Sequence, residues 1–463
     1  MATGLFSGRA IAKNNQAGQD PQENSTGATE QSVSGPAPLP VETPDLPKLP
    51  ARIENGVKVF HLIAEVVKRE FLPGKTFDVW GFNGSMPGPT IEVDQGDRVR
   101  IIVDNHLPEP TSVHWHGFEV PVEMDGVPGV TQDPIPPGGR FIYEFTLHQH
   151  GTFFYHSHMA MQEMLGMIGL FIMHPKESHR PLVHKDFGLI VQEWAILPNN
   201  PVPNTLSMEF NWLTMNGKAG PATTPIIVKQ GERVRIRLVN LGMDHHPIHL
   251  HGHQFTITGT EGGRIPESAW YPTNTVLLGV AQARDIEFDA KYAGDWIFHC
   301  HLPHHMMNQM ASMVGPMSHV GQGMHTGMSM EDGMGMVQGH ALAEELGPSL
   351  GRAIGVGAAF EKATTNLPLQ PQQSAGQDRQ HDMQHGEPQM VPGYPQDMFM
   401  PMDEAVAKPE TYGLRPTWSA GVQGMMTLVR VLPPDLYEKV KELQAQGRKG
   451  APSPMPPEHQ HSM

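Results

Sequence analysis

The stretch IEVDQGDRVRIIVDN (Ile91–Asn105) recurs later in the chain as IIVKQGERVRIRLVN (Ile226–Asn240). Apolar and polar residues alternate on both sides of a central glycine, which is the pattern of two β-strands joined by a turn. At the same spacing after each stretch stand two histidines separated by one residue, HWH at 114–116 and HLH at 249–251. The chain therefore contains a duplicated β unit.

Each copy ends with a second pair of this kind. GTFFYHSH (Gly151–His158) in the first copy matches GDWIFHCH (Gly294–His301) in the second. A repeat of this length has a normal domain size. We therefore predict an all-β protein with one domain at residues 51–176 and a second at residues 185–317.

The segments outside the two predicted domains differ in composition. Residues 1–50 are rich in Gln, Ser, Pro and Gly and are predicted to be disordered. Residues 318–410 form a low-complexity, Met- and His-rich segment with one short helix predicted near Ala341–Phe360. Within residues 411–445, GVQGMMTLVRVLPPDLYEKV (Gly421–Val440) predicts a strand that returns to the edge of the second domain, followed by a short helix. Residues 446–463 are predicted to be a tail.

Composition narrows the classes of function. The net charge of −16 argues against a nucleic-acid partner, and no apolar stretch is long enough to indicate a membrane span. The N-terminal MATGLFSGRAIAKNN lacks the apolar core of a clear signal peptide. One cysteine excludes an intrachain disulfide and any multi-cysteine metal site. The 27 His and 30 Met are potential metal ligands, and thioethers favour copper.

The paired histidines point to a metal cluster. Alternate residues of a strand face the same side, so each pair projects two imidazoles from one surface. One pair alone could be a chance surface feature, whereas four pairs at matched positions in a duplicated unit are not expected by chance. Zinc takes about four ligands, so eight imidazoles suit a cluster of several ions: His114, His116, His156, His158, His249, His251, His299 and His301.

The single cysteine, Cys300, stands between two of these histidines. His305 follows it, Met310 lies further on, and His246 precedes the HLH pair. One thiolate, two imidazoles and a distant thioether are the ligands of a blue-copper electron-transfer site. His299 and His301 point away from the Cys300 side chain, so the cysteine can bind one copper while its neighbours bind the cluster. The competing interpretation is a buried inert thiol.

The first copy provides an internal comparison for this site. Ser157 takes the position of Cys300, Gln162 that of His305 and Thr111 that of His246, and only the methionine is retained, as Met167. The first domain is therefore predicted to have cluster histidines and no blue-copper site.

Four motifs resemble those of the multicopper oxidases, the laccase-like family: HWHG (114–117), YHSH (155–158), HPIHLHGHQF (246–255) and HCHLPHHMMNQM (299–310). The resemblance implies two cupredoxin-like Greek-key β-sandwich domains and four coppers per subunit. It assigns His246, Cys300, His305 and Met310 to the type 1 copper, and His114 and His249 to the type 2 copper. One type 3 copper would take His116, His156 and His301, and the other His158, His251 and His299.

The implied reaction is one-electron oxidation of a donor at type 1, with electrons passing through Cys300, His299 and His301 to the cluster. There O2 is reduced to water. The donor stays open between phenols or aromatic amines and cuprous ion, the second suggested by the methionines around the motifs and in residues 318–410. A copper-storage protein and a copper nitrite reductase fit less well, because the latter has its type 1 cysteine in the first domain and no trinuclear cluster.

Three further expectations come from the resemblance. Asp125, in EMDGVPG, stands where relatives carry an acid that relays protons, although an aspartate before Gly126 is also typical of a simple turn. The two-domain, small-laccase branch implies a homotrimer with each cluster at a subunit interface, because a head-to-tail contact must close into a ring. Family members are periplasmic or secreted.

Overall fold

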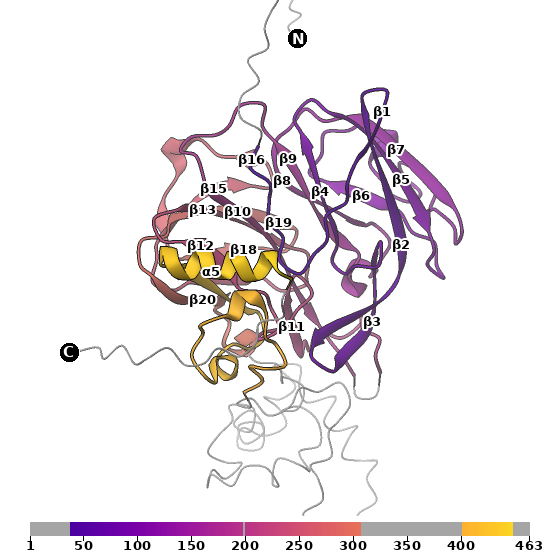
Figure 1. Ribbon diagram of the computed structural model, residues 1–463. Coiled ribbons are helices and arrows are strands. Elements are labelled where there is room, and N and C mark those ends of the chain that lie inside the picture. The colour runs from indigo at the N-terminus through magenta and orange to yellow at the C-terminus, as the bar shows by residue number, and fades with distance from the viewer. Residues whose placement is uncertain (1–37, 198–199, 307–400, 448–463) are drawn as a thin grey trace, which may run out of the picture. The chain divides into compact units, whose positions relative to one another are not determined.

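The computed structural model describes residues 38–197, 200–306 and 401–447. All of them belong to one compact unit that begins at Pro38. They form two β-sandwiches, each built from two sheets (Figure 1), which confirms the predicted all-β class. No helix in the described part of the chain is long and apolar enough to cross a membrane.

The first sandwich contains residues of the first copy. One sheet has the order β1-β2-β5-β7 with β3 paired to β2, and its strands are β1 (Arg52–Glu54), β2 (Val57–Leu72), β3 (Lys75–Phe82), β5 (Arg98–Asn105) and β7 (Arg140–Thr146). The facing sheet has the order β4-β9-β8-β6, with β4 (Gly88–Asp94), β6 (Val113–His116), β8 (Gly151–Ser157) and β9 (Ile168–His174). Trp115, Tyr143 and Phe171 pack in the core between them.

The second sandwich repeats this plan. Its larger sheet has the order β11-β10-β13-β19-β15-β16 with β17 paired to β15, formed by β10 (Lys185–Trp194), β11 (Trp212–Met215), β13 (Arg233–Asn240), β15 (Phe255–Thr260), β16 (Gly263–Arg264), β17 (Pro272–Thr273) and β19 (Gln282–Asp289). Its other sheet has the order β12-β21-β20-β14-β18, formed by β12 (Ile226–Lys229), β14 (His246–Leu250), β18 (Thr275–Leu278), β20 (Gly294–Cys300) and β21 (Met426–Leu432).

In the part of the chain that the structure describes, helices are short apart from α5 (Pro434–Ala445), which packs on β12 and β21. The 3-10 helices among these residues are η1 (Val122–Met124), η2 (Glu163–Leu165), η3 (Glu267–Ala269), η4 (Pro303–Met306), η6 (Pro409–Thr411) and η7 (Trp418–Gly421).

The place of β21 corrects the prediction of an edge strand. β21 lies inside the sheet, antiparallel to β20 and parallel to β12. Every residue of β21 is buried, including Arg430, whose guanidinium binds Asp295 and the carbonyl oxygens of Glu410 and Tyr412. A strand of mainly apolar residues suits the interior of a sheet, where strands pair on both sides, better than an exposed edge.

Two predicted unstructured segments are partly folded. The sequence predicts that residues 38–50 are disordered. In the structure the Val41 side chain is buried, and Glu42 N–H donates to the Asp186 carbonyl oxygen at 2.8 Å. Residues 401–410, expected to be low-complexity, bury Val406, and Lys408 Nζ contacts Asp45 at 3.0 Å. In both segments, single apolar and charged residues contact parts of the chain that are distant in sequence, and such contacts cannot be predicted from composition. Residues 318–400, with the helix predicted near 341–360, lie outside the described residues, as does most of the predicted tail.

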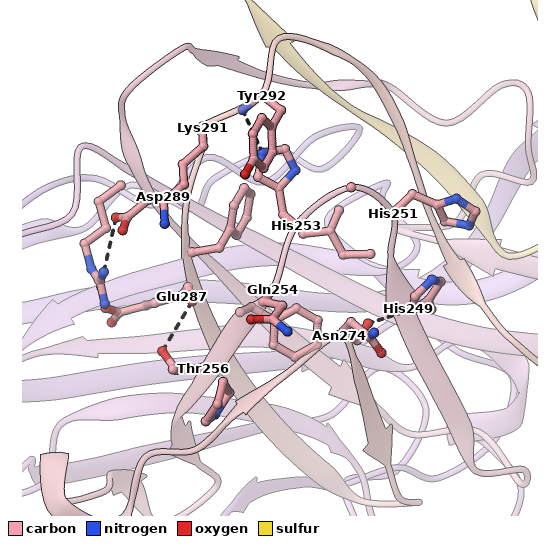
Figure 2. Close-up of a pocket in the computed structure, with 16 residues that line it drawn as sticks. His249, His251, His253, Gln254, Thr256, Asn274, Glu287, Asp289, Lys291 and Tyr292 are labelled. Carbon is pink, nitrogen blue, oxygen red and sulfur yellow. Dashed lines mark hydrogen bonds and ion pairs between the residues drawn. The ribbon is translucent and has the colours of Figure 1, made fainter.

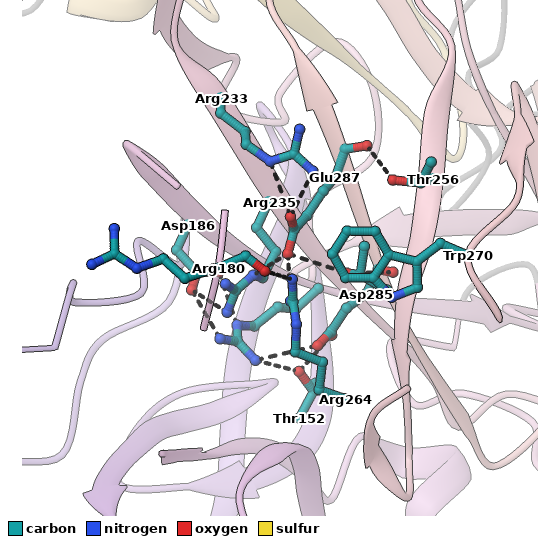
Figure 3. A network of polar contacts seen from close by, with 12 residues as sticks. Thr152, Arg180, Asp186, Arg233, Arg235, Thr256, Arg264, Trp270, Asp285 and Glu287 are labelled. Carbon is teal, nitrogen blue, oxygen red and sulfur yellow. Dashed lines mark hydrogen bonds and ion pairs between the residues drawn. The ribbon is translucent and has the colours of Figure 1, made fainter. Parts of the chain in front are cut away.

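A buried polar network joins the two sandwiches (Figure 3). Arg237 binds both carboxylate oxygens of Asp186 at 2.8 and 2.9 Å, and also donates to Thr152 Oγ1 of β8 at 2.7 Å. Thr152 in turn donates to Asp285 at 2.6 Å. Burial lowers the pKa of Arg237, but Asp186 and Asp285 raise it by more, so the guanidinium stays charged. The charges are paired and hydrogen-bonded, which makes their burial tolerable.

Candidate metal centre

The Cys300 side chain meets two imidazoles in the interior of the second sandwich. Its Sγ lies 3.5 Å from His305 Nδ1 and 3.7 Å from His246 Nδ1, and these two nitrogens are 3.2 Å apart. All three side chains are buried. Two ligand atoms that each lie ~2.0–2.3 Å from one ion must lie within about 4.5 Å of each other. The donor set therefore fits a single metal ion.

Glu193, on β10, orients one of these imidazoles. His246 Nε2 donates to the Glu193 carboxylate at 3.0 Å, and both side chains are fully buried. The same carboxylate accepts the backbone N–H groups of Met243 and Asp244. With its proton held on Nε2, His246 offers the lone pair of Nδ1 toward Cys300. Glu193 is not among the residues predicted from the sequence, although a glutamate within the apolar run LIVQEW (189–194) is a signal that indicates a buried polar role.

Burial determines the protonation of these groups in the metal-free protein. It lowers the pKa of His305 to about 3, with His246 as a further cause, so the imidazole is neutral and keeps its lone pair. Burial raises the pKa of Cys300 to about 12, so the thiol has to lose its proton when a metal binds. The other nitrogen of His305, Nε2, lies 3.5 Å from the half-exposed carboxylate of Asp244.

The matching positions of the first sandwich form a hydrogen-bonded cluster. Gln162 Oε1 accepts from Ser157 Oγ at 2.7 Å and from Thr111 Oγ1 at 2.8 Å. Gln162 donates its amide N–H to the Pro110 carbonyl oxygen at 2.9 Å. The three residues satisfy one another and offer no thiolate or imidazole.

Four histidines gather at the end of β6 and β8. His114 faces His156 in the register of these strands, and its ring centre lies 5.3 Å from those of both His156 and His158. His116 Nδ1 approaches His156 Nε2 to 3.3 Å. Burial, followed by the neighbouring His156 and His114, lowers the pKa of His116 to about 4.

The second sandwich repeats this arrangement. His249 faces His299 across β14 and β20, its ring centre lies 5.4 Å from that of His301, and His251 Nε2 lies 3.1 Å from His299 Nε2. Burial lowers the pKa of His299 to about 4, against the hydrogen bond that it makes to the Cys300 carbonyl. The two half-clusters are thus alike in position and chemistry.

Backbone carbonyls fix several of these rings. His114 Nδ1 donates to the Asp125 carbonyl and His249 Nδ1 to the Asn274 carbonyl, each at 2.7 Å. His156 and His299 donate to the carbonyls of Ser157 and Cys300, each at 2.8 Å. Each bond leaves Nε2 free to bind a metal.

The half-clusters stay separate within one chain. Among the described residues, no ring contact or hydrogen bond joins a histidine of one set to a histidine of the other. The second set opens into a cavity of about 590 Å³ (Figure 2), which is lined by His249, His251, His253, Gln254, Asn274, Lys291 and Tyr292 among others. One chain therefore presents two half-sites.

Comparison with known proteins agrees with this geometry. Two family models, both described as multicopper oxidase, match residues 64–178 and 196–316, which together make just over half of the chain. The chain belongs to the multicopper oxidase family. The two matched segments contain all eight paired histidines, together with His246, Cys300 and His305. The two sandwiches are therefore cupredoxin-like domains, and copper is the metal expected for a multicopper oxidase.

Individual relatives match part of the chain. The chain is 33% identical over 249 residues to Laccase-2 of Botryotinia fuckeliana, covering 48% of this chain and 42% of the relative. It is 42% identical over 113 residues to a copper resistance protein A homolog of Pseudomonas syringae pv. tomato, covering 24% and 19%. The chain thus spans less than half the length of these relatives. A blue copper oxidase from Nitrosomonas europaea is similar in structure, with a TM-score of 0.50, 32% identity and coverage of 54% of this chain and 81% of that chain.

Asp125 and Met310 are the two predicted site residues other than the histidines and Cys300. Asp125 holds His114 through its backbone, while its carboxylate Oδ1 lies 3.5 Å from the same ring nitrogen. Gly126 follows with a φ of +87°, and a side chain there would collide with the Val113 carbonyl, so the turn interpretation is supported and the proton-relay role stays a prediction. Met310, the predicted axial ligand, lies outside the described residues.

Proposed function

We propose that this protein is an oxidase that couples one-electron oxidation of a donor at Cys300 to the four-electron reduction of O2 to water at the paired histidines. The observation that carries the proposal is the direct link between the two kinds of site. Cys300, His246 and His305 would hold one copper and the paired histidines the others, and these coppers would supply the one-electron redox chemistry that O2 reduction requires.

The chain provides two routes between the sites. His299 is bonded covalently to Cys300 through the backbone, and His299 Nδ1 also donates to the Cys300 carbonyl at 2.8 Å. His246 and His305 hold the thiolate side, and Glu193 fixes the orientation of His246. His299, His251 and their neighbours hold the cluster side.

Oxygen uptake tests the proposal directly. The copper-loaded protein should consume O2 when a phenol is added and release no hydrogen peroxide, since reduction proceeds to water. The double variant His249→Ala, His251→Ala should keep a reducible copper at Cys300 but consume no O2. If this variant consumes O2 at the normal rate, the cluster assignment is wrong.

Cuprous ion is the alternative donor. The Asp244 carboxylate lies 3.5 Å from Nε2 of the buried His305, and the preceding residue, Met243, has an exposed side chain. A thioether is a soft ligand that favours Cu(I), and a carboxylate attracts cations through its charge. The similarity to copper resistance protein A also favours this test. Turnover of Cu(I) in the Met243→Leu, Asp244→Asn variant should fall several-fold while phenol turnover is kept. Equal loss on both donors would remove the case for a cuprous substrate.

We further propose that a complete cluster forms between copies, in a homotrimer of the two-domain branch with four coppers per subunit. The support is the separation of the half-clusters and the open cavity beside His249 and His251. Complementation tests this assembly: chains with His114→Ala and His116→Ala are unfolded and refolded together with chains carrying His249→Ala and His251→Ala. Activity should return in the mixture, because some interfaces pair two intact halves. An active monomer in sedimentation would contradict the shared cluster.

A further inference from the structure

The backbone of Met425 is hydrogen-bonded to two residues of the Cys300 site. Its N–H donates to the His305 carbonyl at 2.9 Å, and its carbonyl accepts the Cys300 N–H at 3.0 Å. Met425 immediately precedes β21, the strand that pairs with the cysteine strand β20. One residue is thus bonded to two of the three residues that would hold the type 1 copper.

The Met425 side chain lies on the same side of the sheet as the cysteine sulfur. Met425 and Cys300 are both fully buried and belong to the same core cluster of the second sandwich. The next residue, Met426, packs in a different cluster with Val422 and Leu428. This alternation follows from strand geometry, and directly opposed residues on one face have Cβ atoms about 5 Å apart.

Met167 occupies the position in the first domain that Met425 occupies in the second. Met167 precedes β9, its N–H donates to Gln162 at 3.3 Å, and its carbonyl accepts the Ser157 N–H at 3.0 Å. Gln162 and Ser157 are the counterparts of His305 and Cys300, so Met167 and Met425 make the same two bonds. The register agrees, since Ile168 pairs with His156 and Met426 pairs with His299.

The surrounding sequences agree as well. GMIGLFIM (Gly166–Met173) aligns with GMMTLVRV (Gly424–Val431). The glycine before each methionine has a positive φ, +114° at Gly166 and +60° at Gly424, which is the left-handed turn that leads into the strand. Sequence spacing paired Met167 with Met310, whereas the strands pair it with Met425.

We propose that Met425, rather than Met310, supplies the axial thioether of the type 1 copper. The proposal rests on the proposed function, since it names a ligand of that site. The family match ends at residue 316, so Met425 stands outside the region in which family spacing would place the ligand. Residues 306–424 would then contain an insertion within the metal-binding loop, between its histidine and its methionine, where the first domain has only residues 163–166.

The test compares reduction potentials in the copper-loaded full chain. Met425→Leu removes a donor that stabilises Cu(II), so the type 1 potential should rise, while Met425→Gln supplies a harder oxygen donor and should lower it and change the electron paramagnetic resonance spectrum. Both substitutions roughly preserve the volume of the side chain, so the fold should tolerate them. Met310→Leu and the opposite-face control Met426→Leu should leave potential and spectrum unchanged.

The outcomes separate this proposal from the one it rests on. If the unaltered protein shows no blue absorption, the type 1 site itself is wrong. If blue absorption is present and Met310→Leu shifts the potential as much as or more than Met425→Leu, the assignment of Met425 is overturned. The Met310→Leu arm decides this even if a Met425 variant fails to fold.

Discussion

At the scale of single residues, the protonation of the Cys300 thiol controls metal binding. Burial raises the pKa of its thiol to about 12, so in the metal-free protein it is protonated and unreactive. To hold a copper ion, Cys300 would have to give up that proton, and its thiolate would then supply the strong metal–sulfur bond that gives a blue-copper site its colour and a path for electrons toward His299. His305 requires no such exchange, because its imidazole is already neutral.

Cys300→Ser should therefore abolish the intense blue absorption and all donor oxidation, because a serine hydroxyl is a weak ligand. The paired histidines are untouched and should retain most of the remaining copper, measured by metal analysis. Circular dichroism should match the unaltered protein. A variant that stays blue would rule out the thiolate as ligand.

Glu92, on β4, illustrates the scale of the element. Burial raises the pKa of its carboxyl, but hydrogen bonds from His174, Lys48 and the Val41 backbone lower it by more, to about 2. The carboxylate thus ties residues 38–50 to β4 and β9. Because the folded-state pKa is depressed, the stabilisation is present above about pH 4.5 and is lost as the pH falls toward 2.

Glu92→Gln should lower the free energy of unfolding at pH 7 by about 2 kcal/mol. This figure is the energy equivalent of the depressed pKa of Glu92, reduced because the side chain is partly exposed to solvent. The difference from the unaltered protein should shrink as the pH falls from about 4.5 to 2. Urea unfolding at several pH values measures both. A constant difference across this range would show that the substitution acts through packing instead of charge.

Elements also show where sequence reasoning succeeded and where it stopped. The duplication, the strand pattern and the position of each histidine followed from Ile91–Asn105 and its repeat, because periodicity and spacing are local. The interior place of β21, the partners of Lys408 and the role of Glu193 depend on contacts between residues far apart in the chain. Met167 was aligned by spacing, and spacing fails once residues are inserted into one copy.

The folded state of residues 401–410 leads to a prediction about the Met- and His-rich segment. Deleting residues 317–400 should lower Cu(I) turnover more than phenol turnover if that segment concentrates cuprous ion. Deleting 317–410 should also cost stability, because Val406 and the Lys408–Asp45 pair are lost. Equal melting temperatures for the two deletions would contradict the structural role of 401–410.

At the scale of the whole molecule, Thr152 links the sandwiches through Arg237 and Asp285. Thr152→Val keeps the shape but removes both bonds and leaves two buried charged groups each short of a partner. We expect a loss of about 1–3 kcal/mol in the free energy of unfolding. Thr152→Ser, which keeps the hydroxyl, should lose much less. If valine and serine behave alike, the hydroxyl is not what holds the two sandwiches.

The interior position of β21 has a consequence for how the protein is made. A ribosome delivers the first sandwich, then β10 to β20, and reaches Met426–Leu432 only after all of these strands. Until then β12 and β20 lack the strand that lies between them, so the second sandwich stays open while the first can already fold as a unit. Copper delivered to a nascent chain would find the domain 1 histidines assembled first, and the cysteine site would be the last to receive its metal.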